Sequence, residues 1–316
     1  ENEWYPNYVE PVLKETSIRA YKCHMKYITE MIGAIKLQKL TSTQIQQMYV
    51  SLMQKSPFSD KPLSYRTVLD VHRTLTSALN VAKEIGYIKN NPTIGTKLRK
   101  PSCFEEEKKM VYDADEVQEL LIGVKETPLE MYFRLILEAT LRRGEALALT
   151  WADIDWDKST IRINKSWVED RNSNPILSTP KTKSSVRTIK LTSEMMQMLK
   201  RARNDYNTRK LAGGDFVDSQ RIISQKNGKP YNPKSFYQLF KRTIRKLGLP
   251  EIRLHDLRHT GITLQLENGA NIKAVSTRAG HSSIKITGDI YSHCTQKMEN
   301  ETVDIIEKVF EPVVNQ

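Results

Sequence analysis

Apolar residues recur at helical spacing over most of the N-terminal third of the chain. The longest such pattern covers residues 64–82, and shorter ones cover residues 17–28 and 41–49. Hydroxyl-bearing residues precede the patterns as candidate N-caps, and an Asn-Pro pair at residues 91–92 interrupts helix after the last of them. We therefore expect residues 1–100 to form a domain of four helices.

The pattern changes after a charged segment that contains Pro101, and residues 101–110 are expected to be a linker. Beyond it helical patterns predominate, but residues 160–168 and 186–191 alternate between apolar and polar positions as strands do. We expect residues 111–298 to form a mainly α-helical domain with a small antiparallel β-sheet, in which a hairpin joins these two strands.

The end of the chain carries one more helical pattern. Val303, Ile306, Val309 and Phe310 lie on one face of a short helix within residues 299–316. So short a helix is marginally stable in isolation, so it must dock either on its own domain or on a neighbouring protomer.

The charge of the chain favours a polyanionic partner. Lys and Arg number 49 against 37 Asp and Glu, which gives a net charge of +12, and residues 1–100 hold 15 of the basic residues against 8 acidic ones. Such a balance suits a helical clamp on nucleic acid, although a basic solvated surface would have the same composition. No apolar run approaches the roughly 20 residues of a membrane span.

The three cysteines, Cys23, Cys103 and Cys294, are far apart and lack metal-binding spacing. They indicate a reduced, cytoplasmic protein without a disulfide framework or a thiolate zinc site. The chain carries no signal peptide and opens without a methionine, so we expect a natural N-terminal segment to be missing.

Residues able to surround and attack a phosphate lie close together near the C-terminus. His255 and Arg258 share the segment Arg-Leu-His-Asp-Leu-Arg-His and lie three residues apart, which places them on one face of a helix. His281 follows a glycine, where a helix would end. Tyr291 comes ten residues later. An arginine and two imidazoles can donate to a phosphate, and a phenol can attack it.

Two further segments supply the remaining groups for such a reaction. Arg142 and Arg143 are followed by Glu145 in the segment Ala-Thr-Leu-Arg-Arg-Gly-Glu. Lys181 and Lys183 precede the second predicted strand, within the expected hairpin. A second arginine would stabilise negative charge on the phosphate, and a lysine on a hairpin could protonate the leaving oxygen.

In this order and spacing, the residues resemble those of the tyrosine recombinase (phage integrase) family, closely over residues 110–295. The resemblance implies a helical core-binding domain followed by a catalytic domain. It places the arginines of the site at Arg142 and Arg258, since the family motif Leu-Arg-x-Gly-Glu has the active arginine first. Thr140 stands where the family usually has glycine, and Ala279 where it usually has leucine.

The resemblance also implies a mechanism. Tyr291 is the nucleophile, Lys183 is the general acid with Lys181 as the alternative, and His255 and His281 contact the phosphate or the tyrosine proton. Glu145 holds the arginine segment. The product is a 3′-phosphotyrosine link with a free 5′-hydroxyl, and the reaction needs no cofactor, no metal ion and no ATP.

The partners implied are double-stranded DNA and further copies of the chain, which assemble on it as dimers to tetramers. An accessory DNA-bending or excision factor is also expected, and no membrane. The most similar enzymes are integrases of conjugative transposons and phages, so we expect a bacterial, nucleoid-associated enzyme whose tail helix is exchanged between protomers. The alternatives are a chromosome-dimer-resolving recombinase, a type IB topoisomerase and a non-catalytic DNA-binding protein.

Overall fold

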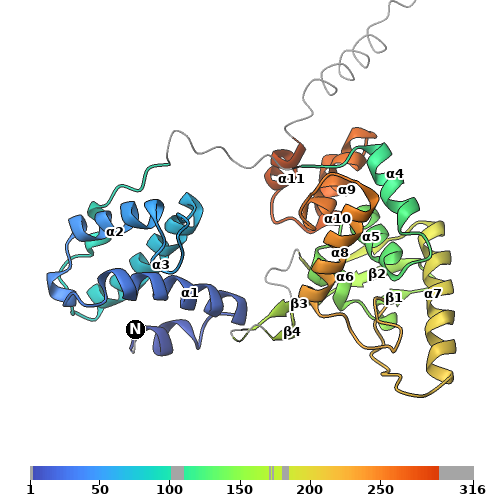
Figure 1. The fold of residues 1–316 in the computed structure, drawn as a ribbon, viewed down its shortest axis with the longest axis horizontal. Coiled ribbons are helices and arrows are strands. Elements are labelled where there is room, and N and C mark those ends of the chain that lie inside the picture. The colour runs from blue at the N-terminus through green and yellow to red at the C-terminus, as the bar shows by residue number, and fades with distance from the viewer. Residues whose placement is uncertain (1–2, 101–109, 171, 173, 180–184, 292–316) are drawn as a thin grey trace, which may run out of the picture. The chain divides into compact units, whose positions relative to one another are not determined.

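The computed structural model describes residues 3–100, 110–170, 172, 174–179 and 185–291. The chain divides into two compact units, one of residues 1–107 with 169–174 and one of residues 108–168 with 175–316. Both units are mainly helical, and the strands are short and confined to one segment of the sequence, which confirms the predicted fold class (Figure 1). Within the described residues, no helix combines the length and apolar character needed to cross a membrane.

The described part of the first unit contains three α-helices: α1 (Glu15–Ile32), α2 (Ser42–Gln54) and α3 (Tyr65–Glu84). Short helical turns cover Tyr5–Val9, Leu37–Lys39 and Pro92–Gly95, so the prediction of four helices was wrong. The last turn begins after Asn91, whose side chain accepts from the Thr93 amide, and ends where Thr96 is extended.

Local caps fix where these helices begin. Thr41 and Gln44 form a capping box, in which the Thr41 hydroxyl accepts from the Gln44 amide at 3.3 Å and the Gln44 side chain accepts from the Thr41 amide at 3.0 Å. Ser64 caps α3 through the Thr67 amide in the same position. The helices bury one apolar face each, from which the core of the unit is built: Met25, Ile28, Ile32, Ile45, Met48, Tyr49, Leu52, Val68, Val71, Leu75 and Leu79.

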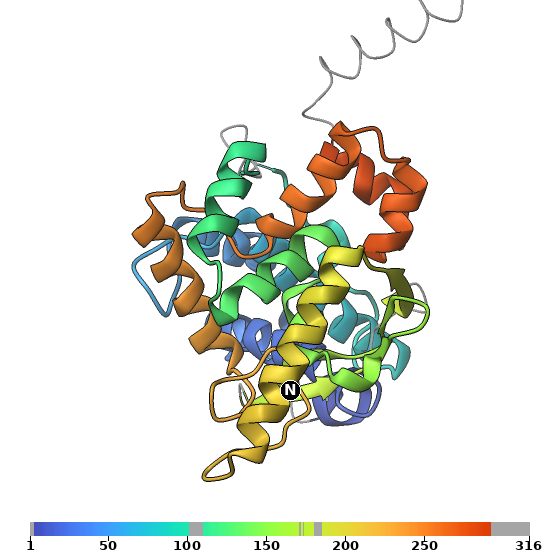
Figure 2. The ribbon, with the colours of Figure 1, turned by 90° about the vertical axis from the view of Figure 1, so that its right-hand side faces the viewer.

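The second unit contains eight α-helices among its described residues: α4 (Ala114–Gly123), α5 (Pro128–Glu138), α6 (Arg143–Ala148), α7 (Ser193–Leu211), α8 (Pro233–Leu247), α9 (Asp256–Glu267), α10 (Ile272–Ala279) and α11 (Ile284–Tyr291). Its strands lie between α6 and α7: β1 (Ile154–Asp155), β2 (Thr160–Ile163), β3 (Ser166–Glu169), β4 (Pro175–Ser178) and β5 (Arg187–Lys190). Figure 2 shows the long α7 in yellow and α10 and α11 in red.

The strands form two sheets. Strands β1, β2 and β5 form an antiparallel sheet in which Ile161 is opposite Ile189, and β3 pairs with β4 in a separate hairpin. The single strand predicted over residues 160–168 is therefore wrong. It breaks at Lys165, whose ammonium binds the buried Asp153 carboxylate at 2.7 Å and the Thr150 hydroxyl at 2.9 Å, so the chain leaves the first sheet there.

Helices α5 and α9 pack closely at the centre of the second unit. A Cβ at Gly261 of α9 would lie 2.2 Å from the Leu137 carbonyl oxygen of α5, so only glycine allows this approach. Tyr132, Phe133 and Leu135 of α5 are fully buried in the core beside it. The segments that carry the candidate site adjoin this closely packed pair.

Candidate active site

Helix α10 ends at Gly280, and this turn lies at the centre of the candidate site. Gly280 adopts φ 68°, a left-handed conformation that favours glycine at a helix C-terminus. A Cβ there would also lie 2.9 Å from Nη1 of Arg187. Glycine is thus required twice, for the backbone conformation and for the close approach of an arginine.

Arg142 reaches this turn from the start of α6, where it occupies the N-cap position. Its backbone amide donates to Glu145 Oε2 at 2.9 Å and its Nη1 to Glu145 Oε1 at 2.8 Å. Its Nη2 donates to the Gly280 carbonyl at 3.0 Å. The side chain remains 38% exposed, so Arg142 is held in place from one side and is accessible from the other.

Arg258 lies in the first turn of α9 and is 1% exposed. Its guanidinium donates to the Ala279 carbonyl at 2.6 Å and to the carbonyl of Thr140. Burial, and then the nearby positive charge of Arg142, lower the pKa of Arg258 to about 9. The group therefore remains protonated at neutral pH, and its two backbone contacts fix the plane of the guanidinium.

Thr140 has φ 50°, which is uncommon for a β-branched residue. It is fully buried, and its hydroxyl has no hydrogen-bond partner among the described residues. The turn that it makes directs its carbonyl to Arg258 and carries the chain on to Arg142. This geometry gives a physical reason why glycine would suit the position.

Glu145 is a buried carboxylate between two arginines. Arg187 of β5 donates to it from Nη2 at 2.9 Å and from Nη1 at 3.2 Å, in addition to the two bonds from Arg142. Burial alone would raise the pKa of Glu145, but the hydrogen bonds and charges of Arg187 and Arg142 outweigh it and hold the pKa below its ordinary value. Glu145 is therefore ionised and links β5 to the start of α6.

Sequence reasoning gave Arg187 no role in the site. A signal was present, because Arg187 and Ile189 are the two inward-facing residues of β5, and an arginine on the buried face of a strand requires a partner. The partner, Glu145, lies 42 residues away in the sequence and could not be identified from spacing.

Both candidate histidines belong to this unit and are held near neutral charge. His255 precedes α9 and stacks edge-to-face on His259 with ring centroids 4.7 Å apart. Burial, and then Arg258, lower its pKa. His281 Nδ1 shares a hydrogen bond of 2.8 Å with the Thr287 hydroxyl, and burial, then Arg258, lower its pKa to about 4. A neutral imidazole can accept a proton or donate one N–H.

Tyr291 is the last residue of α11 and is 6% exposed. Helix α11 packs on α9 and α10, and the Tyr291 ring belongs to a small apolar cluster with Ile262, Leu266 and Ala279. Because Thr287 of the same helix binds His281, the fold of α11 couples the tyrosine to the turn that holds the arginines.

The remaining predicted groups are a neighbouring arginine, two lysines and the tail helix. Arg143, the alternative to Arg142, is the first residue of α6. Lys183, its alternative Lys181 and the tail helix over residues 299–316 lie outside the described residues. Within the part of the chain that is described, no group of three His, Cys, Asp or Glu side chains could hold a metal ion.

Comparison with known proteins gives the same family for both parts of the sequence. The model of the phage integrase family matches residues 110–298, and the model of the phage integrase N-terminal SAM-like domain matches residues 2–53. A XerC-like tyrosine recombinase of Caldanaerobacter subterraneus is 29% identical over 97% of this chain and 81% of its own. The ICEBs1 integrase of Bacillus subtilis is 27% identical over 88% of this chain and 74% of its own.

Solved structures show the same fold. The Tn1549 transposon integrase, in complex with transposon right-end DNA, superposes with a TM-score of 0.76 at 21% identity and covers 94% of this chain and 97% of its own. The lambda integrase dimer bound to a core site gives a TM-score of 0.67 at 16% identity, over 92% of this chain and 93% of its own. With a family model that matches more than half of its residues, the chain belongs to the phage integrase family of tyrosine recombinases.

Proposed function

We propose that this chain is a site-specific DNA recombinase that cleaves and rejoins DNA strands through a 3′-phosphotyrosine intermediate on Tyr291. The observation that carries the proposal is the convergence of Arg142 and Arg258 on one turn, with His281 beside them and Tyr291 on the helix that packs against it. The substrate is double-stranded DNA, on which several copies of the chain assemble.

The arginines would stabilise the charge that develops on the phosphate. Attack of a phenol on a phosphodiester places negative charge on the two non-bridging oxygens, and fixed guanidinium donors lower the energy of that state. Arg142 is the more accessible of the two, and Arg258 is fixed by its carbonyl contacts. Neither has to be ordered when DNA binds, which reduces the entropic cost of the reaction.

The histidines and a lysine would move the protons. The Tyr291 oxygen forms a bond to phosphorus while the phosphorus–O5′ bond breaks, so one proton leaves the phenol and one reaches O5′. We assign the first to His255, whose lowered pKa leaves it neutral and able to accept. His281 would donate to a non-bridging oxygen from Nε2, since Thr287 occupies Nδ1. Lys183, or Lys181 in its place, would protonate O5′.

Covalent trapping from a mixed pool of DNA tests the proposal whatever the target sequence is. The pool consists of duplexes with a randomised central segment and a nick, so that the cleaved fragment diffuses away and the protein stays attached. We expect adducts that survive denaturation, and none from Tyr291→Phe, which lacks only the hydroxyl and should bind the same DNA. A non-catalytic DNA-binding protein would give no adduct from either form, and adduct of normal yield from Tyr291→Phe would refute the assignment of the nucleophile.

The sequences recovered in this experiment also decide between two biological roles. Integration and excision of a mobile element is the role that we propose, because relatives include the ICEBs1 integrase and the transposase of Tn916. Resolution of chromosome dimers is the alternative role. If the recovered sequence matches the ends of a mobile element in the genome, the first role is supported. If it matches a single chromosomal site away from any element, the second is supported.

A further inference from the structure

Three consecutive carbonyl groups at the end of α10 each accept a hydrogen bond from a different arginine. The Arg278 carbonyl accepts from Arg187 Nε at 2.6 Å, the Ala279 carbonyl from Arg258 at 2.6 Å and the Gly280 carbonyl from Arg142 at 3.0 Å. The last carbonyls of a helix lack partners within the helix and carry partial negative charge, so they suit cations. The position of this turn thus determines where three guanidinium groups lie.

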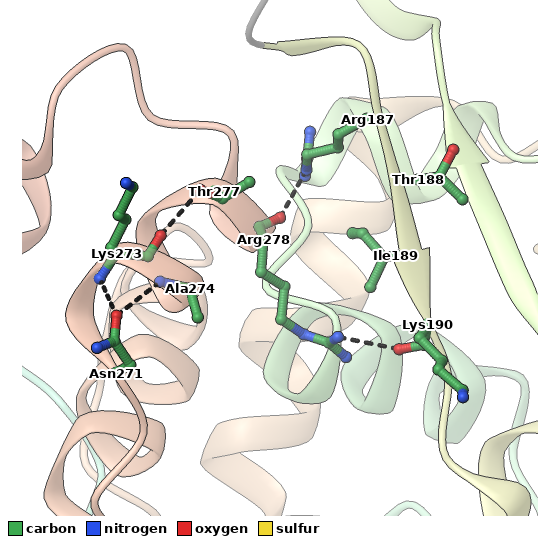
Figure 3. Close-up of a pocket in the computed structure, with 9 residues that line it drawn as sticks. All are labelled: Arg187, Thr188, Ile189, Lys190, Asn271, Lys273, Ala274, Thr277 and Arg278. Carbon is green, nitrogen blue, oxygen red and sulfur yellow. Dashed lines mark hydrogen bonds between the residues drawn. The ribbon is translucent and has the colours of Figure 1, made fainter.

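The side chain of Arg278 fixes that turn to the rest of the unit. Its Nε and Nη2 donate to the Glu138 carbonyl at 3.1 and 3.0 Å, and its Nη1 donates to the Lys190 carbonyl at 2.9 Å. Glu138 is the last residue of α5 and Lys190 is the last residue of β5. Figure 3 shows the side chain of Arg278 reaching from α10 towards β5. Arg187 donates to the Arg278 carbonyl, and the Arg278 guanidinium donates to the Lys190 carbonyl.

Helix α5 and strand β5 are directly connected in the chain to two of the arginines that donate to this turn. Arg142 follows the end of α5 by four residues, and Arg187 opens the strand that Lys190 closes. One guanidinium therefore holds the turn, the Arg142 segment and the Arg187 strand in a fixed relation. Its three nitrogens all donate to backbone carbonyls, which leaves Arg278 engaged in the protein and argues against a direct contact with DNA.

We propose that Arg278 is a positioning residue for strand cleavage, which acts by setting where Arg142 and Arg258 lie around the scissile phosphate and where Arg187 holds Glu145. This inference rests on the proposed function. Without Arg278, the last turn of α10 would be free to shift relative to α5 and β5, and a displacement of about 1 Å can slow a reaction by roughly a hundredfold. The effect should fall on cleavage and leave DNA affinity largely intact.

The test compares Arg278→Ala and Arg278→Lys with a matched control, Lys273→Ala. Lys273 lies on the same helix and lines the same groove, of about 500 Å³, so the control removes a positive charge there and leaves the carbonyl contacts in place. Adduct formation is followed in single turnover at saturating DNA, on one trapped sequence. The scissile group is either a normal phosphodiester or a methylphosphonate, which carries no charge on its non-bridging atoms.

We expect Arg278→Ala to cleave the phosphodiester at least about tenfold more slowly, with DNA affinity within about threefold of the unmodified chain. On the methylphosphonate the deficit should shrink, because less charge has to be stabilised by the arginines. Arg278→Lys keeps the charge, but its ammonium is a single point donor and cannot bridge both carbonyls. Its cleavage rate should therefore lie between those of the unmodified chain and Arg278→Ala. Lys273→Ala should cleave at the normal rate.

Several results would overturn the inference. Normal cleavage by Arg278→Ala would do so, and so would an equal deficit on both substrates or a loss confined to DNA affinity. If circular dichroism shows that Arg278→Ala is unfolded, Arg278→Lys is judged by the same comparison of substrates. Absence of adduct from the unmodified chain would refute the proposed function and this inference with it, whereas a normal rate for the variants refutes the inference alone.

Discussion

Replacement of Glu145 by glutamine should destabilise the second unit, and the structure shows why. The carboxylate is 3% exposed and accepts four hydrogen bonds, two on each oxygen, from Arg142 and Arg187. Glutamine has nearly the same shape, but one of its terminal atoms is an NH2 group. That group would face two donors instead of accepting from them, and the charge between the arginines would be lost.

The size of the effect follows from what remains buried. Removal of one partner of a buried ion pair costs about 3–5 kcal/mol, because the other charge stays in the protein without compensation. The Arg187 side chain is 5% exposed and cannot turn to water, whereas Arg142 is 38% exposed and can. Only Arg187 would remain buried without a compensating negative charge. We therefore expect a loss near the lower end of this range, about 3 kcal/mol in the free energy of unfolding.

Urea unfolding followed by tryptophan fluorescence measures this loss. Trp151, Trp156 and Trp167 lie in the second unit, so the signal reports mainly on the unit that contains Glu145. The matched control is Glu251→Gln, which removes the carboxylate of an exposed ion pair with Arg245 and should leave the midpoint almost unchanged because solvent screens that pair.

The pH dependence provides an independent check. Arg187 and Arg142 hold the pKa of Glu145 below its ordinary value of 4.5, so its contribution to stability is present above that pH and is lost as the pH falls through the folded-state pKa. The difference in the free energy of unfolding between the unmodified chain and Glu145→Gln should therefore be at its full size at about pH 7 and should become smaller below about pH 4.5. A gap under about 1 kcal/mol at neutral pH, or one that does not change with acidification, would refute this reasoning.

Two glycine substitutions test the backbone of the site by the same unfolding assay. Thr140→Gly should raise the free energy of unfolding by up to about 1 kcal/mol, because glycine adopts the positive φ of this position without strain. It should therefore be more stable than Thr140→Ala, which retains the strain. The opposite order of stability would contradict the prediction. Gly280→Ala should cost about 1–3 kcal/mol and more than Gly269→Ala, since both residues have positive φ but only the first Cβ would meet Arg187. Equal losses would show that this contact is unimportant.

Local spacing in the sequence accounts for some of the contacts within the candidate site, but not for the distant ones. His255 and Arg258 could be placed together because helical spacing is a local property. The same holds for Glu145, which lies three residues after Arg142 and bonds to it across the first turn of α6. Alternation in β5 marked Arg187 as inward-facing, but its partner Glu145 lies 42 residues away and could not be identified from spacing. Arg278 was missed because its side chain bonds to backbone carbonyls of distant residues, which leave no mark in the sequence.

The sheet was predicted in outline only, for a related reason. Alternation over residues 160–168 identified strand conformation correctly on both sides of Lys165, but the break depends on a tertiary ion pair with Asp153. Strand β1 is two residues long, too short for alternation to reveal. Thr140, which stands where the family usually has glycine, adopts a positive φ that the sequence analysis did not predict.

The balance of charge in the site explains how an arginine cluster can be stable before its substrate arrives. Arg142 and Arg187 bind the Glu145 carboxylate while Arg258 bonds to carbonyls, so among the described residues that these contacts join, three guanidiniums meet one carboxylate and positive charge is in excess. The same excess helps to lower the pKa of His281, after burial. The carbonyls at the end of α10 offset part of it through partial charges and hydrogen bonds, without adding a second anion. A second carboxylate would neutralise the arginines and weaken their attraction for a phosphate, whereas carbonyl groups orient the guanidiniums and leave their full charges in place.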